Sequence, residues 1–154
     1  MNYKLKVKAK SLWDMRERQE MRLAYEWAGK ELGIDIHSEH AKCVLILDGA
    51  EWCSGWTILT KNFKFVVAVS GWTDEWEDVL ETLFHEMTHL RQYLTGDLVD
   101  VKADVCEWKG KEYSGDWSEA HESNSEYWNA PWEVEAREKG AKLLKKWKKL
   151  TSNA

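Results

Sequence analysis

A helical pattern of apolar residues runs from residue 76 to residue 94. Apolar side chains recur there at intervals of three and four, which predicts an amphipathic helix with one broad buried face. Thr73 is a favourable N-cap for this helix, and Gly96 is a favourable residue just beyond its C-terminal end. The buried face is predicted to consist of Trp76, Val79, Leu80, Leu83, Phe84, Met87, Leu90 and Leu94.

The same spacing predicts two further helices. One covers about residues 12–33 and ends at Gly33. The other follows Pro131, the only proline in the chain, because proline is favourable in the first turn of a helix. The buried side of this C-terminal helix is predicted to contain Ala136, Gly140, Leu143, Leu144, Trp147 and Leu150.

Shorter apolar runs predict strands. The run at 2–9 alternates with lysines and is typical of an edge strand, whereas the unbroken run at 42–48 is typical of a central one. Short turns predict that the last four segments form two hairpins. The predicted strands cover residues 2–9, 42–48, 56–60, 63–70, 103–107 and 111–114. The fold class that these elements predict is α+β, with a small, mainly antiparallel sheet and three flanking helices in a single domain, residues 1–154.

Metal-binding chemistry is suggested by the sequence HEMTH on the helix predicted over residues 76–94. His85 and His89 lie four residues apart, on one side of a helix, so both imidazoles can bind one Zn²⁺. Glu86 is then positioned as general base for a water that the metal activates. At about 100° per residue, the histidines fall nearly opposite the apolar stripe and are expected to face a cleft. The plain alternative is a solvated helix face that carries two histidines by chance.

Two histidines do not complete a catalytic zinc site, which usually has three protein ligands. Three downstream residues are candidates: Glu133, Glu135 and His121. Glu133 shares the buried side of the C-terminal helix with Ala136 and Gly140, whereas Glu135 points almost the opposite way. An inward carboxylate needs a partner, and a metal ion is a suitable one. A glutamate that only favours the helix N-terminus is the alternative interpretation of Glu133.

The HEMTH helix and the later segment PWEVEA resemble the zincin metallopeptidases, in particular compact gluzincins and the ImmA/IrrE-type peptidases. That resemblance implies that Glu133 is the third ligand, and that a strand near the HEMTH helix pairs with an extended substrate. Those families often have Asn or Asp four residues after the ligand, where this chain has Arg137. SprT-like proteases use a third histidine instead, but their aromatic pattern is missing around His121.

Three more polar residues are candidates for roles beside the metal. Gln92 follows His89 by three residues and is interpreted either as a hydrogen-bond partner of substrate or ligand, or as a surface residue. Tyr127 and Tyr113 could each donate a hydrogen bond to the oxyanion of a tetrahedral intermediate. Tyr127 is preferred because it lies just before the C-terminal helix that carries Glu133.

Composition narrows the class of protein. The net charge of −5 argues against a general nucleic-acid binder, and the lysines near the C-terminus suit the end of a helix. No apolar run approaches about 18 residues, so no membrane partner is expected. Cys43, Cys53 and Cys106 lack CxxC spacing and are predicted to be reduced, mostly buried thiols in a cytoplasmic protein.

These observations predict a small zinc-dependent endopeptidase that acts on a protein or peptide. Zn²⁺ would be bound by His85, His89 and Glu133, with Glu86 as general base. The resemblance implies a relation to the minimal zincins of bacteria, archaea and phages. One alternative is a zincin-fold binding module that uses zinc for stability or for docking a partner, in which Glu86 would have no task. Another is a regulatory protease that cuts a repressor.

Overall fold

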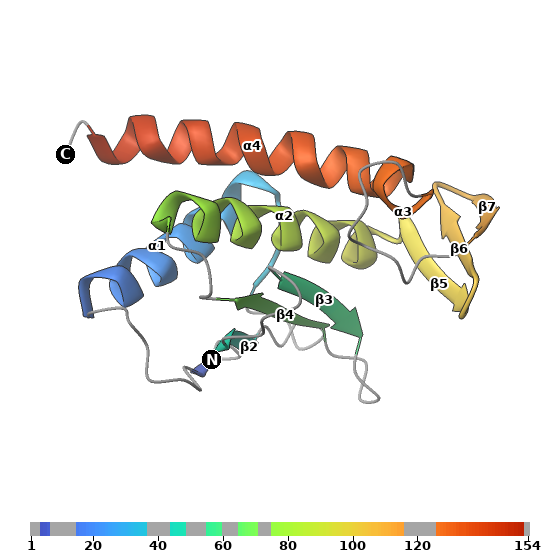
Figure 1. The fold of residues 1–154 in the computed structure, drawn as a ribbon, viewed down its shortest axis with the longest axis horizontal. Coiled ribbons are helices and arrows are strands. Elements are labelled where there is room, and N and C mark those ends of the chain that lie inside the picture. The colour runs from blue at the N-terminus through green and yellow to red at the C-terminus, as the bar shows by residue number, and fades with distance from the viewer. Residues whose placement is uncertain are drawn as a thin grey trace.

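The structure is a computed structural model, and it describes residues 4–6, 15–36, 44–48, 55–59, 65–70, 75–115 and 126–152. These residues form four helices and seven strands, in two sheets (Figure 1). The helices are α1 (Met15–Glu31), α2 (Trp76–Thr95), α3 (Glu126–Asn129) and α4 (Pro131–Ser152). The strands are β1 (Lys4–Lys6), β2 (Val44–Asp48), β3 (Gly55–Leu59), β4 (Phe65–Ser70), β5 (Leu98–Lys102), β6 (Val105–Trp108) and β7 (Lys111–Ser114).

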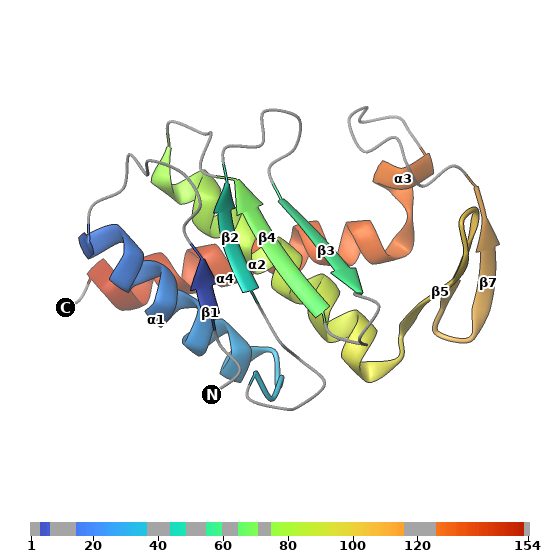
Figure 2. The same cartoon turned by 90° about the horizontal axis from the view of Figure 1, so that it is seen from below.

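The four-stranded sheet has the order β1-β2-β4-β3 (Figure 2). The predicted edge position of β1, the interior position of β2 and the β3–β4 hairpin are confirmed. The expectation of one mainly antiparallel sheet is wrong here, because β1–β2 and β2–β4 are both parallel pairs. Parallel neighbours need a long crossover, and the segment containing α1 provides one between β1 and β2.

The smaller sheet is antiparallel throughout and has the order β5-β6-β7. The predicted hairpin is confirmed, with its strands at Val105–Trp108 and Lys111–Ser114. Lys109 and Gly110 have φ of 49° and 82°, and two successive left-handed residues match the twist of a hairpin. Tyr93 of α2 donates its hydroxyl to Asp100 of β5 at 3.2 Å, so this sheet is attached near the C-terminal end of α2.

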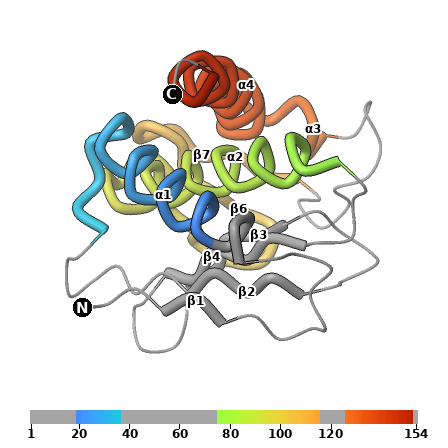
Figure 3. Tube along the Cα trace, turned by 90° about the vertical axis from the view of Figure 1, so that its left-hand side faces the viewer, coloured from blue at the N-terminus to red at the C-terminus, as the bar shows by residue number. Residues whose placement is uncertain are grey.

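Helix α2 lies between the four-stranded sheet and α4 (Figure 1). Figure 3 shows α1 and α2 together beneath α4. The apolar stripe predicted for α2 packs with α1 and the C-terminal half of α4 in one core. Its fully buried members include Met21, Tyr25, Leu83, Phe84, Met87, Leu90 and Leu143. Helix α4 covers the other side of α2, so the histidine face lies against α4, where His89 is buried and His85 is partly exposed.

Two details of the helix ends differ from expectation. The N-cap of α2 is Glu75, which makes no side-chain capping bond, and not Thr73, which lies outside the described residues. The acidic first turn of α2 offsets the missing cap through the helix dipole. Leu150 was predicted to be buried but is 55 % exposed, because Trp147 is the last residue of α4 in the core. Gly96 has φ of 78° and ends α2 as predicted.

Among the described parts of the chain, no helix is both long and apolar enough to cross a membrane. Cys106 is a buried free thiol, as predicted, and burial followed by the nearby Asp100 raises its pKa to about 11. Cys43 and Cys53 lie outside the described residues.

Candidate metal centre

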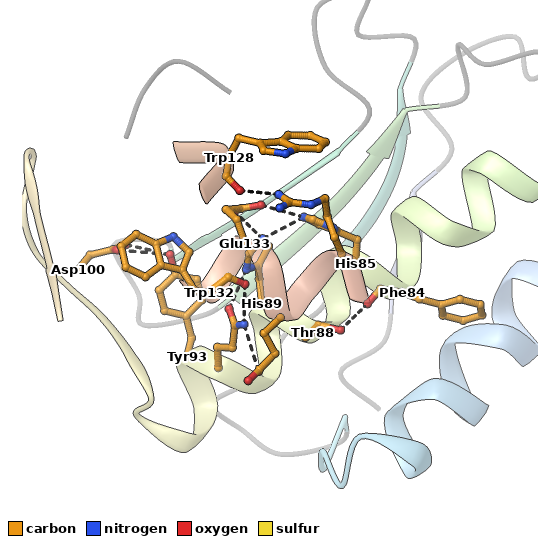
Figure 4. A network of polar contacts seen from close by, with 12 residues as sticks. Phe84, His85, Thr88, His89, Tyr93, Asp100, Trp128, Trp132 and Glu133 are labelled. Carbon is orange, nitrogen blue, oxygen red and sulfur yellow. Dashed lines mark hydrogen bonds and ion pairs between the residues drawn. The ribbon is translucent and has the colours of Figure 1, made fainter. Parts of the chain in front are cut away.

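His85 and His89 of α2 meet Glu133 of α4 at one point between the two helices (Figure 4). The Nε2 atom of His85 lies 3.2 Å from Oε2 of Glu133, and Nε2 of His89 lies 2.9 Å from Oε1. The two Nε2 atoms are 3.2 Å apart. All three potential ligand atoms lie within 4.8 Å of one another, so this cluster could hold a metal ion.

The spacing of these donors fits a tetrahedral ion. Zinc bonds of about 2.0–2.1 Å place neighbouring ligand atoms of a tetrahedron about 3.3 Å apart. The two Nε2 atoms are 3.2 Å apart, and each lies 2.9 or 3.2 Å from a different oxygen of Glu133. With either oxygen as the ligand, two of the three separations are therefore close to that edge length. Two imidazoles and one carboxylate are also the donor types of known catalytic zinc sites with an open position. The donor set and its spacing therefore suit zinc.

Close packing of α4 on α2 makes this convergence possible. A Cβ atom at Gly140 would lie 3.2 Å from the backbone nitrogen of His85 and 3.3 Å from its Cα. These distances are shorter than most real contacts of a Cβ atom, and backbone atoms cannot rotate away. Gly140 therefore allows the two helix backbones to approach closely beside His85. Glu133, about two turns earlier on α4, is brought to the histidines as a result.

Glu133 and His89 form a buried ion pair. Burial alone would raise the pKa of Glu133, but hydrogen bonds from His85 and His89 hold it well below its usual range. Burial would likewise lower the pKa of His89, and the bond to Glu133 with its charge, helped by Glu86, raises it to about 9. In the absence of metal, His89 therefore carries two ring protons at neutral pH.

Gln92 orients His89. Its amide nitrogen donates to the backbone oxygen of Trp132 at 2.9 Å and to Glu135 Oε1 at 3.3 Å. Its side-chain oxygen must then face Nδ1 of His89, at 2.8 Å, and accept that proton. The Nδ1 proton is retained there, so loss of the other proton leaves Nε2 as the atom that could bind a metal. Gln92 is buried and hydrogen-bonds His89, a predicted ligand, so the interpretation of Gln92 as a surface residue is wrong.

Arg137 and Glu135 do not bind the cluster. Arg137 donates to the backbone oxygen of Trp128 at 2.7 Å and not to a histidine. The side chain that hydrogen-bonds a histidine of the cluster is instead that of Gln92, on α2. Glu135 was expected to point away from α2, which is wrong. Its side chain is 31 % exposed, accepts from Gln92 and lies 4.0 Å from Lys109. The hydrogen bond from Gln92 of α2 turns the Glu135 side chain toward α2. The periodicity of α4 alone does not predict a contact between two helices.

Tyr127 and Glu86 border the cluster. The Tyr127 hydroxyl bonds to Glu133, and burial, followed by the charge of Glu133, raises its pKa far above the ordinary value. Glu86 is 6 % exposed, and its charge contributes to the raised pKa values of both His89 and Tyr127. The predicted general base and the preferred oxyanion donor therefore both lie beside the predicted ligands. His121 lies outside the described residues.

Trp132, Trp108 and Tyr113 pack together next to the cluster, and this aromatic group was not predicted from the sequence. Tyr113, the second tyrosine candidate, packs edge-on against Trp132, with ring centroids 5.6 Å apart. Trp108 also packs against Trp132, with ring centroids 6.3 Å apart and the rings tilted by 51°. Trp132 thus joins the small sheet to the first turn of α4 while its backbone oxygen binds Gln92. Its place directly before Glu133 was the available sequence signal.

Comparisons with known proteins add no assignment. Searches against protein-family models, curated proteins and solved structures each found no match. The argument for function therefore depends on the motifs and on the geometry of this centre.

Proposed function

We propose that this protein is a small zinc-dependent endopeptidase. The observation that carries the proposal is the convergence of His85, His89 and Glu133, with potential ligand atoms within 4.8 Å, beside the buried Glu86. When bound at these three residues, zinc would supply a Lewis acid that polarises a peptide carbonyl and acidifies a water. Peptide hydrolysis needs both effects together with a nearby base, and Glu86 is suited to that role.

The protein's own groups have distinct tasks in this proposal. Glu86 takes the proton of the attacking water and passes it to the leaving amine. Tyr127 stays protonated at every physiological pH because its pKa is raised, so its hydroxyl remains a donor for the developing oxyanion. Gln92 holds the tautomer of His89 through the bond at Nδ1.

Strand β3 suits the binding of an extended substrate. It pairs with β4 on one side only and forms an edge of the four-stranded sheet (Figure 2). Strand β3 also contacts α2, the helix that carries the histidines. An edge strand presents unpaired backbone donors and acceptors, and a peptide can add to it as a further strand. In the proposed enzyme, β3 therefore aligns the peptide chain along the metal centre.

Hydrolysis by the zinc-loaded chain with and without Glu86 tests the proposal. The wild-type chain should contain one zinc and cut peptides of a randomised fluorogenic mixture, and Glu86→Gln should keep the zinc. The variant should lose at least about a hundredfold in rate, the usual contribution of a general base. Glu77→Gln makes the same chemical change at an exposed site of α2 and should not lower the rate. A binding module that uses zinc for stability would bind zinc and cut nothing in either form.

A further inference from the structure

Arg137 lies one helical turn after Glu133, next to the proposed active site. A spacing of four residues places both side chains on nearly the same face of α4. Arg137 contacts Trp128, which follows Tyr127 in the chain. The hydroxyl of Tyr127 is hydrogen-bonded to Glu133. Figure 4 shows Trp128 beside Glu133 and His85. The pair formed by Arg137 and Trp128 therefore borders the metal centre.

Two contacts hold the guanidinium in place. Nη1 of Arg137 donates to the backbone oxygen of Trp128 at 2.7 Å, and Cζ lies 3.9 Å from the centroid of its ring. Trp128 is 37 % exposed and Arg137 is half-buried, so the pair is reachable from solvent. A cation placed over an indole ring is stabilised by the negative face of the ring. The side chain is thereby ordered before any ligand arrives, which lowers the entropic cost of binding one.

The charge of Arg137 has no carboxylate partner in the described parts of the chain. Other cations there, such as Lys146 and Lys148, lie 3.1 and 2.8 Å from glutamates. The sequence has 27 acidic against 22 basic residues, so carboxylates are plentiful. Within the described residues, Arg137 makes one hydrogen bond, to Trp128, although a guanidinium has five donors. An ordered cation with donors to spare is suited to bind an anionic group.

We propose, on the basis of the endopeptidase function above, that Arg137 determines specificity by binding a carboxylate of the peptide substrate. A guanidinium binds a carboxylate through two parallel hydrogen bonds, which gives both affinity and orientation. Four helical residues span about 6 Å, and an extended peptide spans about 3.3–3.6 Å per residue. The bound carboxylate therefore lies within about two residues of the scissile bond. It belongs either to an Asp or Glu side chain or to the C-terminus of the peptide.

Matched peptides separate these two sources. Sequences cut from the randomised fluorogenic mixture are resynthesised with Glu or Gln at each of three positions on either side of the cut. A second set ends two residues after the cut, as free acid or as amide. For the zinc-loaded wild type, one set should show a preference for the acid of about tenfold or more in kcat/KM, mainly through KM.

Variants of Arg137 then test the assignment. Arg137→Gln should reduce the ratio of acid to neutral kcat/KM to about one, and Arg137→Lys should leave an intermediate ratio because it keeps only the point charge. Lys142→Gln removes one exposed positive charge from another face of α4 and should leave the ratio unchanged. A preference that survives in Arg137→Gln, or a wild type that cuts acidic and neutral peptides equally, would overturn the proposal.

Calorimetry distinguishes failure of this inference from failure of the proposed enzyme, and it uses fixed pairs of short peptides that differ only in Glu against Gln, or in a free against an amidated C-terminus. If the wild type cuts nothing but binds acidic peptides, and Arg137→Gln does not bind them, carboxylate recognition stands and the endopeptidase proposal falls. If peptides are cut without any acid preference, the endopeptidase stands and the role of Arg137 falls. If the zinc-loaded chain neither cuts nor binds any peptide, both are wrong.

Discussion

Gly140 of α4 lies against the backbone of His85, and this contact sets the distance between the two helices that carry the candidate metal ligands. A Cβ atom added at Gly140 would meet the nitrogen and Cα of His85 at 3.2 and 3.3 Å. The glycine is therefore a requirement of the site, although it binds nothing itself.

Replacing this glycine should weaken zinc binding. Gly140→Ala forces α4 away from α2 by a few tenths of an ångström, because the contacting atoms belong to the backbone. Alanine favours the helix by about 0.5–1 kcal/mol, so overall stability can change in either direction. Zinc affinity, measured by chelator competition, should fall roughly tenfold in Gly140→Ala and further in Gly140→Ser. Ala141→Ser, at an exposed neighbour, is the control, and equal affinity of all four proteins would contradict the prediction.

The choice of third ligand can be tested with two neighbouring glutamates. Glu133→Ala should lower zinc affinity by several orders of magnitude, because its carboxylate lies 3.2 and 2.9 Å from the two imidazoles. Glu135→Ala should lower it by less than about tenfold, since Glu135 acts only through Gln92. His121→Ala is expected to leave it unchanged. Isothermal titration of each variant with zinc gives the comparison, and a large loss in His121→Ala with little loss in Glu133→Ala would reverse the assignment.

Removal of Gln92 should affect His89 specifically. Gln92→Leu leaves Nδ1 of His89 and the Trp132 oxygen without this partner, and loss of such contacts typically costs tenfold to about a hundredfold in metal affinity. Gln92→Glu keeps an acceptor for Nδ1 and should retain more affinity than Gln92→Leu. Nitrogen NMR of the zinc-loaded chain should show a protonated Nδ1 in the wild type and a change at His89 in Gln92→Leu. An unaltered His89 spectrum would show that Gln92 serves packing alone.

The pH dependence of the metal-free protein follows from the ion pair between His89 and Glu133. The pKa of His89 rises from 6.5 to about 9 on folding, so its stabilisation is complete below pH 6.5 and is lost as pH rises through 9. The pKa of Glu133 is lowered from 4.5, so its stabilisation is present above pH 4.5 and is lost in acid. Both describe one interaction, worth on the order of 3 kcal/mol, and are not added.

Chemical unfolding of the metal-free chain should therefore show greatest stability between about pH 4.5 and 6.5 and a decline toward pH 9. Zinc must displace a proton from His89, so zinc affinity should rise by up to about tenfold per pH unit between pH 7 and 9 and then level off. Titration calorimetry in buffers of different ionisation enthalpy should detect the released proton. Stability and zinc affinity that are both constant from pH 6.5 to 9 would contradict a protonated His89.

The helices, their ends and the tight turn were predictable from residues close together in the sequence. The spacing of HEMTH and of the apolar stripe predicted α2, and Gly33, Gly96 and the turn at Lys109 each lie where their backbone angles require. The inward position of Glu133 followed from its spacing to buried residues of α4. These features depend on residues within one or two turns of one another, so a single sequence contains the necessary information.

Features that depend on contacts between distant segments were not predictable in the same way. The parallel pairing of β1 with β2 depends on where the chain returns after α1. The inward turn of Glu135 depends on Gln92, and the support under the cluster depends on Trp132 meeting Trp108 and Tyr113. Helix periodicity describes one element at a time, so it cannot report which side chain of another element will be nearby.

Helix α2 is enclosed on both sides, and this has a consequence for how such a protein can vary. From Leu83 to Leu90 every side chain except that of His85 is buried, so the residues that build the core are interleaved with those that would perform the chemistry. Few substitutions between Leu83 and Leu90 can therefore be neutral. New specificity has to arise in less enclosed segments nearby, such as α3, which contacts α4, and β5, which contacts α2. Trp128, Val99 and Val101 of these segments reach solvent. Directed evolution aimed at these segments should change what the protein recognises while leaving the proposed metal site intact.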